Sequence, residues 1–183
     1  MTLDINIPRL ETERLILRAP CEADLDAEAA FFASDASKFV GGPKRRDETW
    51  RSIAMLLGHW VMRGYGFWAL DDKETGTFLG HVGLWGPEGW PESEIGWTLM
   101  NGATGKGYAT EAALAARAYA YDILGWPTAI SLIDPANTPS QRVAERLGAT
   151  FESEYEHPAF GTTHVWRHPG PDAVVNGGME AYA

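Results

Sequence analysis

The sequence predicts an α+β (mixed α/β) domain in which a central, mostly antiparallel, twisted sheet of about seven strands is flanked by helices. Three strand-like runs at 67–71, 78–85 and 94–100 are separated only by short segments rich in turn-forming residues, a pattern typical of an antiparallel meander. A Gly-rich turn then leads into an Ala-rich helical stretch at 108–124 and a further strand at 128–133. This order predicts a strand–helix–strand unit beside the meander.

The N-terminal elements follow from the spacing of apolar residues. Alternation over 10–19 predicts the first strand, and helical spacing predicts a helix at 22–34. The clearest amphipathic helix lies at 47–63, where apolar residues recur every three or four positions. These residues are Trp50, Ile53, Ala54, Leu57, Trp60 and Val61. Two helices are therefore expected between the first strand and the meander.

The C-terminal elements complete the sheet. A short helix is expected at 138–147, and it ends at Gly148, the residue type that most often follows a helix in the left-handed conformation. The segments 151–156 and 163–167 alternate as the last two strands.

Length and composition favour a single domain at 1–168, followed by a C-terminal tail at 169–183 where the composition changes. The chain has 25 acidic and 15 basic residues, a formal net charge of −10. This charge argues against nucleic acid as a partner and would attract a cationic or amine-bearing one, although it also serves solubility. No apolar run is long enough for a membrane span. A single cysteine, Cys21, fits a reducing compartment, so a soluble, cytoplasmic protein is expected.

The segment 102–109 has the composition of an anion-binding turn. It connects a strand to a helix, so unpaired N–H groups and the positive end of the helix dipole can face a bound phosphate. Gly105, Gly107 and Ala109 keep side chains out of the turn. The alternative is a strand-to-helix turn that has glycine for steric reasons alone.

Residue counts exclude two better-known phosphate motifs. Met100 stands where a P-loop needs its first glycine, and Thr110 stands where a dinucleotide fingerprint needs its last. Residues 101–150 contain four basic and four acidic side chains, so all of the net negative charge lies elsewhere in the chain. This neutrality favours the anion-binding interpretation.

The turn also resembles a known motif. Residues 105–112 are similar to the acetyl-coenzyme A pyrophosphate loop of the GNAT N-acetyltransferases, whose pattern is Gln/Arg-x-x-Gly-x-Gly/Ala. Thr104, Gly107 and Ala109 fall on its first, fourth and sixth positions, and Thr104 departs from the usual Gln or Arg. Residues 137–151 are similar to the second signature of the superfamily, and they match best the branch typified by ribosomal-protein N-terminal acetyltransferases.

The segments 10–18, 93–97 and 166–169 also look like that branch, so the resemblance covers roughly residues 9–169. It implies acetyl-CoA (acetyl-coenzyme A) as co-substrate and a GNAT-like sheet. In such a sheet the fourth and fifth strands, here 94–100 and 128–133, are splayed around the pantetheine arm.

The resemblance also implies which residues bind the co-substrate. These are Thr104, Gly105, Lys106, Gly107, Tyr108, Ala109 and Thr110 in the turn, with Leu99 and Asn137. A main-chain amide near Leu99 would receive the thioester oxygen. Asn137 would hold the loop and the pantetheine amides, and the alternative is a turn-forming Asn after Pro135.

Two residues are the candidates for proton transfer. Glu94 is the expected general base, and this role requires burial, a raised pKa or a water relay; the alternative is a solvent-facing strand carboxylate. Family members often place a Tyr acid where this chain has Ala144. In the ribosomal-protein branch a Ser at the position of Ser140 takes that place, and the alternative is a hydroxyl that serves the first turn of the helix.

Other chemistry-bearing residues are expected to be structural. His164 and His168 have no carboxylate or Cys at metal-ligand spacing, so no metal site is predicted. Cys21 has no local His and is not expected to be a catalytic thiol. Trp90, in a loop rich in Gly and Pro, is a candidate acceptor-side aromatic, with a core position as the alternative.

The predicted function is acetyl-CoA-dependent N-acetyltransfer to a primary amine, either a protein N-terminus or a small amine, by direct attack in a ternary complex. The acceptor loops would lie near 35–48, near 86–92 and after 156. Dimers are common in the family, which leaves a homodimer open. The alternative from another class is a non-catalytic acyl-CoA-binding or regulatory module, which the absence of a Tyr at position 144 supports.

Overall fold

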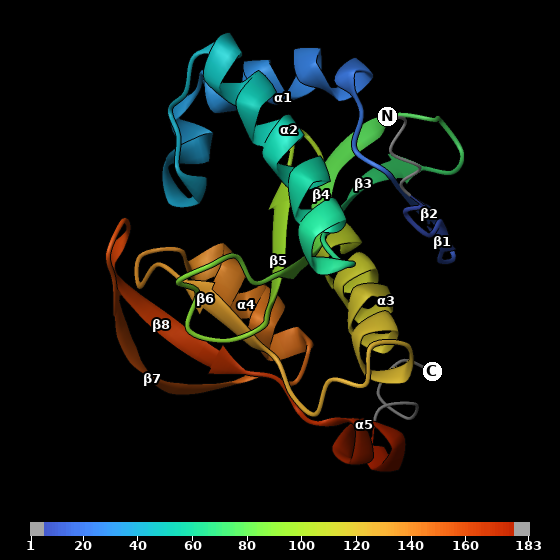
Figure 1. Ribbon diagram of the computed structural model, residues 1–183, viewed down its shortest axis with the longest axis vertical. Helices are drawn as coiled ribbons and strands as arrows, with labels where there is room; N and C mark the ends of the chain where they lie inside the picture. The colour runs from blue at the N-terminus through green and yellow to red at the C-terminus, as the bar shows by residue number, and fades with distance from the viewer. Residues whose placement is uncertain (1–5, 178–183) are drawn as a thin grey trace.

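The computed structural model describes residues 6–177, whose strands form one eight-stranded sheet in the order β1-β2-β3-β4-β5-β6-β8-β7 (Figure 1). All neighbouring strands run antiparallel except β5 and β6, which are parallel. The predicted mixed, mostly antiparallel architecture is therefore confirmed. The strands are β1 Leu10–Glu11, β2 Leu15–Arg18, β3 Phe67–Asp72, β4 Phe78–Trp85, β5 Glu94–Leu99, β6 Ile130–Ile133, β7 Thr150–His157 and β8 Gly161–Arg167.

Helices lie against this sheet (Figure 1). The short 3-10 helices are η1 Glu22–Asp24 and η2 Asp35–Val40. The α-helices are α1 Leu25–Phe32, α2 Arg46–Arg63, α3 Tyr108–Asp122, α4 Thr138–Arg146 and α5 Pro171–Gly177. The predicted end of α4 is confirmed, since Gly148 follows it at φ 75°.

The predicted first strand at 10–19 is interrupted, which raises the strand count from seven to eight. Residues 12–14 leave the sheet between β1 and β2 and contact α3 instead. There the Oγ1 of Thr12 and the Nε of Arg14 donate to the two carboxylate oxygens of Glu111, at 2.5 and 2.7 Å. The chain reverses direction here, because β1 and β2 pair antiparallel and the N–H of Thr12 donates to the carbonyl of Leu15 at 3.0 Å. The predicted single strand is therefore a tight hairpin whose turn is held by α3.

The two faces of β5 have different neighbours. Cross-strand pairs place Glu94 beside Trp85 and Thr98 beside His81, so both β5 residues lie on one face. On that face, Glu28 of α1 accepts a hydrogen bond from the Nε2 of His81 at 2.6 Å. The opposite face packs against the alanines of α3. The fully buried residues of this core include Leu15, Leu17, Trp68, Leu70, Val82, Leu84, Ile95, Ala112, Ala113, Ala116 and Ala120.

The parallel strands β5 and β6 diverge almost as soon as they meet. They share a single register pair, Glu94 with Ile130, and the N–H of Ile130 donates to the carbonyl of Ser93 at 3.0 Å. Beyond that point, hydrogen bonds that involve side chains take the place of the main-chain hydrogen bonds between the two strands. The Oγ of Ser131 donates to the carbonyl of Ile95 at 2.6 Å, and the N–H of Leu132 donates to the Glu94 carboxylate at 3.1 Å. The predicted splay of the fourth and fifth strands corresponds to this gap between β5 and β6.

The C-terminal segment continues past β8. Helix α5 includes part of the stretch predicted as a tail, and its Val174 packs against the main core. The hydroxyl of Tyr121 donates to the carbonyl of Pro169 at 2.8 Å. Positions 178–183 of that stretch lie outside the described residues, and the boundary at 168/169 stays a prediction. Within residues 6–177, no helix has the length and apolarity needed to cross a membrane.

Candidate active site

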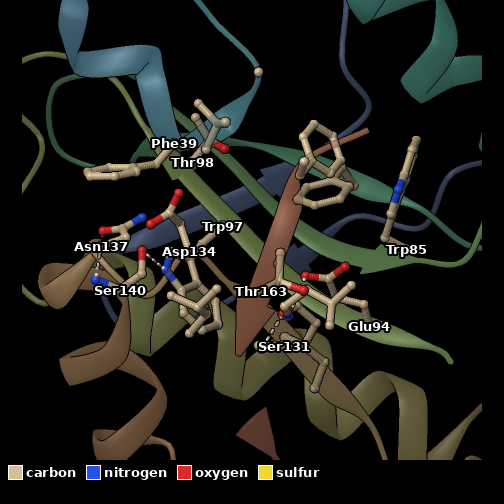
Figure 2. A pocket seen from close by; sticks show the side chains of 18 of the residues that line it. Phe39, Trp85, Glu94, Trp97, Thr98, Ser131, Asp134, Asn137, Ser140 and Thr163 are labelled. Carbon is tan, nitrogen blue, oxygen red and sulfur yellow. Dashed lines mark hydrogen bonds between the residues drawn. The ribbon is translucent and has the colours of Figure 1, made fainter. Parts of the chain in front are cut away.

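A cavity of about 310 Å³ occupies the gap where β5 and β6 diverge. Residues 94–98 and 131–134 line it from the two strands, 38–41 line it from η2 and the residue that follows, and Phe160 and Thr163 line it from the β7–β8 hairpin. Figure 2 shows Trp85, Glu94 and Thr163 on one side and Asp134, Asn137 and Ser140 on the other. Three of the predicted site residues, Glu94, Asn137 and Ser140, thus share one cavity.

Glu94 is buried in the wall of this cavity, with 8% of its surface exposed. The indole Nε1 of Trp90 donates to its Oε2 at 2.6 Å, and the N–H of Leu132 donates to its Oε1 at 3.1 Å. Burial raises the pKa of Glu94 to about 7 even though both hydrogen bonds favour the charged form. Glu94 is therefore not the solvent-facing carboxylate of the alternative interpretation, and its pKa suits proton transfer near neutral pH.

A buried hydrogen-bond chain lies behind Glu94. The hydroxyl of Ser131 uses its one proton on the carbonyl of Ile95, so His168 must be the donor in the 2.9 Å contact between its Nε2 and the Ser131 oxygen. Burial, aided by the charges of Arg117 and Arg167, lowers the pKa of His168 to about 3. His168 is thus a neutral histidine of the core, which agrees with the structural role expected for it from the sequence.

Ser140 lies on the opposite side of the cavity, in the first turn of α4. Its hydroxyl accepts a hydrogen bond from the Nε1 of Trp97 at 3.2 Å, and its N–H donates to the Oδ1 of Asn137 at 3.3 Å. Asn137 is therefore the N-cap of α4 through its side chain. Because Trp97 occupies a lone pair of the hydroxyl and not its proton, Ser140 can still donate a hydrogen bond.

The amide of Leu99 faces the gap between the diverging strands. The next amide, that of Met100, donates to the carbonyl of Leu79 in β4 at 2.9 Å. Successive amides of a strand point to opposite sides, so the N–H of Leu99 points away from β4. This orientation leaves it available to donate a hydrogen bond to a carbonyl oxygen, although Leu99 itself is not among the described residues that line the cavity.

The Gly-rich turn stands at the start of α3, after β5. Gly105 and Gly107 have φ of 77° and 81°, which only glycine adopts readily, and Gly107 is the N-cap of α3 with no side-chain cap. The first N–H groups of a 15-residue helix thus face outward with the dipole behind them.

The other predicted turn residues differ in their surroundings. Thr104 and Lys106 are exposed, and Ala109 is buried. The hydroxyl of Tyr108 donates to Asp72 at 2.9 Å, whereas the Oγ1 of Thr110 is buried without a hydrogen-bond partner within the described chain. None of these turn residues belongs to the described lining of the cavity, so the structure places them at a second location, the start of α3.

Sequence reasoning missed Arg14, which holds the turn from outside. Its Nη1 donates to the carbonyl of Lys106 at 2.9 Å, its Nε pairs with Glu111, and its guanidinium lies 4.8 Å from the centre of the Tyr108 ring. The two partners of the first contact are 92 residues apart, and no local pattern signals the pairing.

The aromatic residues around Glu94 were also missed, apart from Trp90. The Phe67 ring covers Gly96, since a Cβ on Gly96 would lie 2.7 Å from its Cζ. Trp85 and Phe160 complete the wall. Alternation could have placed Phe67 and Trp85 on the face of Glu94, but Phe160 comes from a hairpin tip that has no such signal. Over residues 6–177, no cluster of three or more His, Cys, Asp or Glu side chains is placed to hold a metal ion.

Comparisons with known proteins identify the family and fold of the chain. Residues 14–150 match the sequence model of the acetyltransferase (GNAT) domain. A crystal structure of an acetyltransferase from Agrobacterium tumefaciens superposes with a TM-score of 0.82 at 38% identity, covering 92% of this chain and 98% of that one. The Bacillus subtilis protein YkkB, of uncharacterised function, is 34% identical in an alignment 172 residues long that covers 88% of this chain and 91% of YkkB.

A ribosomal-protein acetyltransferase from Vibrio fischeri has the same fold. It superposes with a TM-score of 0.69 at 18% identity, over 91% of this chain and 98% of that one. The expected likeness to that branch is thus present among the structural neighbours, as a likeness of fold.

Proposed function

Since the chain belongs to the GNAT acetyltransferase family, we propose that it transfers the acetyl group of acetyl-CoA to a primary amine by direct attack in a ternary complex. The observation that carries this proposal is the arrangement of Glu94 and Ser140 on opposite sides of one cavity, between two strands that diverge. The amine would approach on the Glu94 side. The thioester end of the co-substrate would lie on the side of Ser140 and Asn137.

The turn at the start of α3 would hold the diphosphate of acetyl-CoA. Gly105 and Gly107 leave the backbone open to close approach, and the uncapped N–H groups of α3 supply donors. Thr104, Lys106, Tyr108, Ala109 and Thr110 would form the rest of this cradle. Arg14 would keep the turn in shape through the carbonyl of Lys106. Asn137 would hold both α4 and the pantetheine amides.

Glu94 would take the proton that the acceptor must lose. An alkylammonium group has a pKa of about 10, so proton transfer to a carboxyl of pKa about 7 is uphill by about 4 kcal/mol. For a carboxyl at the ordinary value of 4.5 the same transfer would be uphill by about 8 kcal/mol. Burial of Glu94 thus removes about half of the free-energy cost of this proton transfer. The freed amine then attacks the thioester carbon, and the C–N bond forms.

The N–H of Leu99 would stabilise the oxygen that becomes negative during the attack. A positioned donor of this kind is worth about 10²–10³ in rate in other acyl transfers. As the C–S bond breaks, the nitrogen of the new C–N bond must lose a second proton. This proton would reach the departing thiolate through the hydroxyl of Ser140, which gives its own proton to the sulfur and takes up the one from nitrogen. Trp97 would hold the hydroxyl oxygen in place. The products are an acetamide and coenzyme A.

One observation favours a second candidate, a non-catalytic acyl-CoA-binding module. Ala144 is fully buried against Ile133 and Trp166, so no phenol can stand there. The two candidates share the turn at the start of α3 and differ in turnover, which makes them separable.

The test combines coenzyme A binding with thiol release from acetyl-CoA. We expect the protein to bind coenzyme A and to release thiol only when a primary amine is added. Gly107→Val should weaken coenzyme A binding at least tenfold, because a β-branched residue at φ 81° is strained and its Cβ would lie 3.3 Å from Arg14. Tight binding without turnover on any amine would identify the module instead.

A further inference from the structure

The cavity has an aromatic compartment next to Glu94. The Phe67 and Trp85 rings lie edge to face with centres 5.6 Å apart, Trp85 and Trp90 follow at 6.5 Å, and Trp90 and Phe160 at 6.3 Å. These four rings form a continuous wall that meets the carboxylate, because Trp90 also donates to Glu94. A wall of this composition suits an apolar body attached to a single cation.

The charges around the cavity do not suit a polycation. Among the described residues that line it, only Glu94 and Asp134 carry carboxylates. Asp134 lies on the side of Asn137 and Ser140 (Figure 2), and its Oδ1 accepts the N–H of Ala136 at 2.7 Å. Lys38 also lines the cavity. The Nζ of Lys38 lies 4.7 Å from the centre of the Phe39 ring, which is also on the side of Asn137. A second ammonium group would therefore find no second carboxylate beside the four rings.

The tip of the β7–β8 hairpin covers one side of the aromatic compartment. Phe160 lies at the tip of the β7–β8 hairpin and stacks on His157 with ring centres 4.5 Å apart. Its ring reaches the segment after η2, where a Cβ on Gly41 would lie 3.9 Å from it. The hairpin tip and this segment thus approach each other at one side of the cavity and narrow it there, which favours a small molecule over a polypeptide that must extend out of the site.

We propose that the acceptor of this site is a small primary amine with one positive charge and an apolar, ring-sized body. This inference rests on the proposed function and narrows its substrate class. The ammonium group would face Glu94, and the body would lie against Phe67, Trp85 and Phe160. Polyamines would be disfavoured by charge and peptide N-termini by the covering hairpin.

The first experiment compares kcat/KM for thiol release from acetyl-CoA with three acceptors: phenethylamine, spermidine and a tetrapeptide with a free N-terminus. We expect phenethylamine to exceed each of the others at least tenfold, about the discrimination that an apolar pocket gives. A higher value for spermidine or for the peptide would overturn the inference and leave the proposed function standing. No transfer to any amine would overturn the proposed function as well.

The second experiment changes the wall and has an internal control. Phe160 and Phe151 belong to the same hairpin and are 55% and 51% exposed, but only Phe160 lines the cavity. Phe160→Ala should raise the Kd of phenethylamine for the coenzyme A-loaded protein about tenfold, whereas Phe151→Ala should leave it unchanged. Titration calorimetry measures this independently of turnover. Equal effects of the two substitutions would overturn the inference.

Discussion

The two sides of the cavity hold their functional groups in different ways. Glu94 extends from the middle of a sheet, is buried, and receives two hydrogen bonds of 2.6 and 3.1 Å. Ser140 lies in the first turn of a nine-residue helix and is held by longer contacts of 3.2 and 3.3 Å. The Glu94 side is thus fixed in advance and has a perturbed pKa, whereas the Ser140 side can adjust to a sulfur atom whose charge changes during the reaction. The comparison indicates that loss of Glu94 should be more harmful than loss of Ser140.

The largest effect is therefore expected for Glu94→Gln. Glutamine has a similar shape but cannot take a proton from an ammonium group, so kcat should fall about 10²–10³-fold while the Kd of coenzyme A is unchanged. Steady-state thiol release and calorimetry measure the two quantities. An unchanged kcat would mean that Glu94 is not the base.

The pH dependence of kcat/KM, compared between the wild-type protein and Glu94→Gln, gives a second readout. Only the ionised carboxylate can accept a proton, and burial raises its pKa to about 7. The kcat/KM of the wild-type protein should accordingly rise with pH up to about 7, and Glu94→Gln should lack this rise. A rise that persists in the variant would have to belong to another group.

A smaller effect, about tenfold in kcat, is expected for Ser140→Ala. The substitution removes the hydroxyl but keeps the backbone N–H that Asn137 caps, so α4 should keep its stability. Trp97→Phe is the comparison variant, because it leaves the hydroxyl and removes the indole N–H that positions it, while a phenyl ring keeps much of the packing. It should lower kcat less than Ser140→Ala. The reverse order would show that Trp97 acts on the reaction by some other route.

How far the sequence could predict each side depends on how local the determinants are. The glycines of the turn and Asn137 at the start of α4 are fixed by nearby backbone needs, and the sequence indicated both positions, although it did not identify Asn137 as the cap of α4. The alternation of side chains along a strand could place Glu94 on one face of β5, but it could not predict which elements cover that face. The cover comes from η2 and from the tip of the β7–β8 hairpin, which are distant in the chain. Burial of Glu94 is therefore a tertiary property, as is the contact of Arg14 with the turn.

The smallest of these effects concerns His168, the buried histidine that donates a hydrogen bond to Ser131 behind Glu94. In the unfolded chain His168 takes up a proton below pH about 6.5, whereas in the folded protein it does so only near pH 3. The unfolded state therefore binds more protons as the pH falls, and the free energy of unfolding should drop by about 1 kcal/mol between pH 6 and pH 5 from this residue alone. Glu94 acts in the opposite direction over this range, because its pKa is raised in the folded protein and its protonation stabilises the fold as the pH falls. The drop due to His168 is therefore the difference between the wild-type protein and His168→Gln, measured by urea unfolding at the two pH values.

Ser131→Ala separates the two causes that could hold His168 neutral. The substitution removes the oxygen that accepts from Nε2 but leaves the ring buried, and burial is the main reason that the pKa of His168 is low. The loss of stability that His168 contributes in acid should therefore persist in Ser131→Ala. The substitution also leaves the carbonyl of Ile95 without its side-chain donor, which removes one link between β5 and β6. If the loss vanished instead, the hydrogen bond and not burial would set the pKa. The neutral state of His168, which supports the Glu94 side of the cavity, would then depend on the hydroxyl of Ser131 alone.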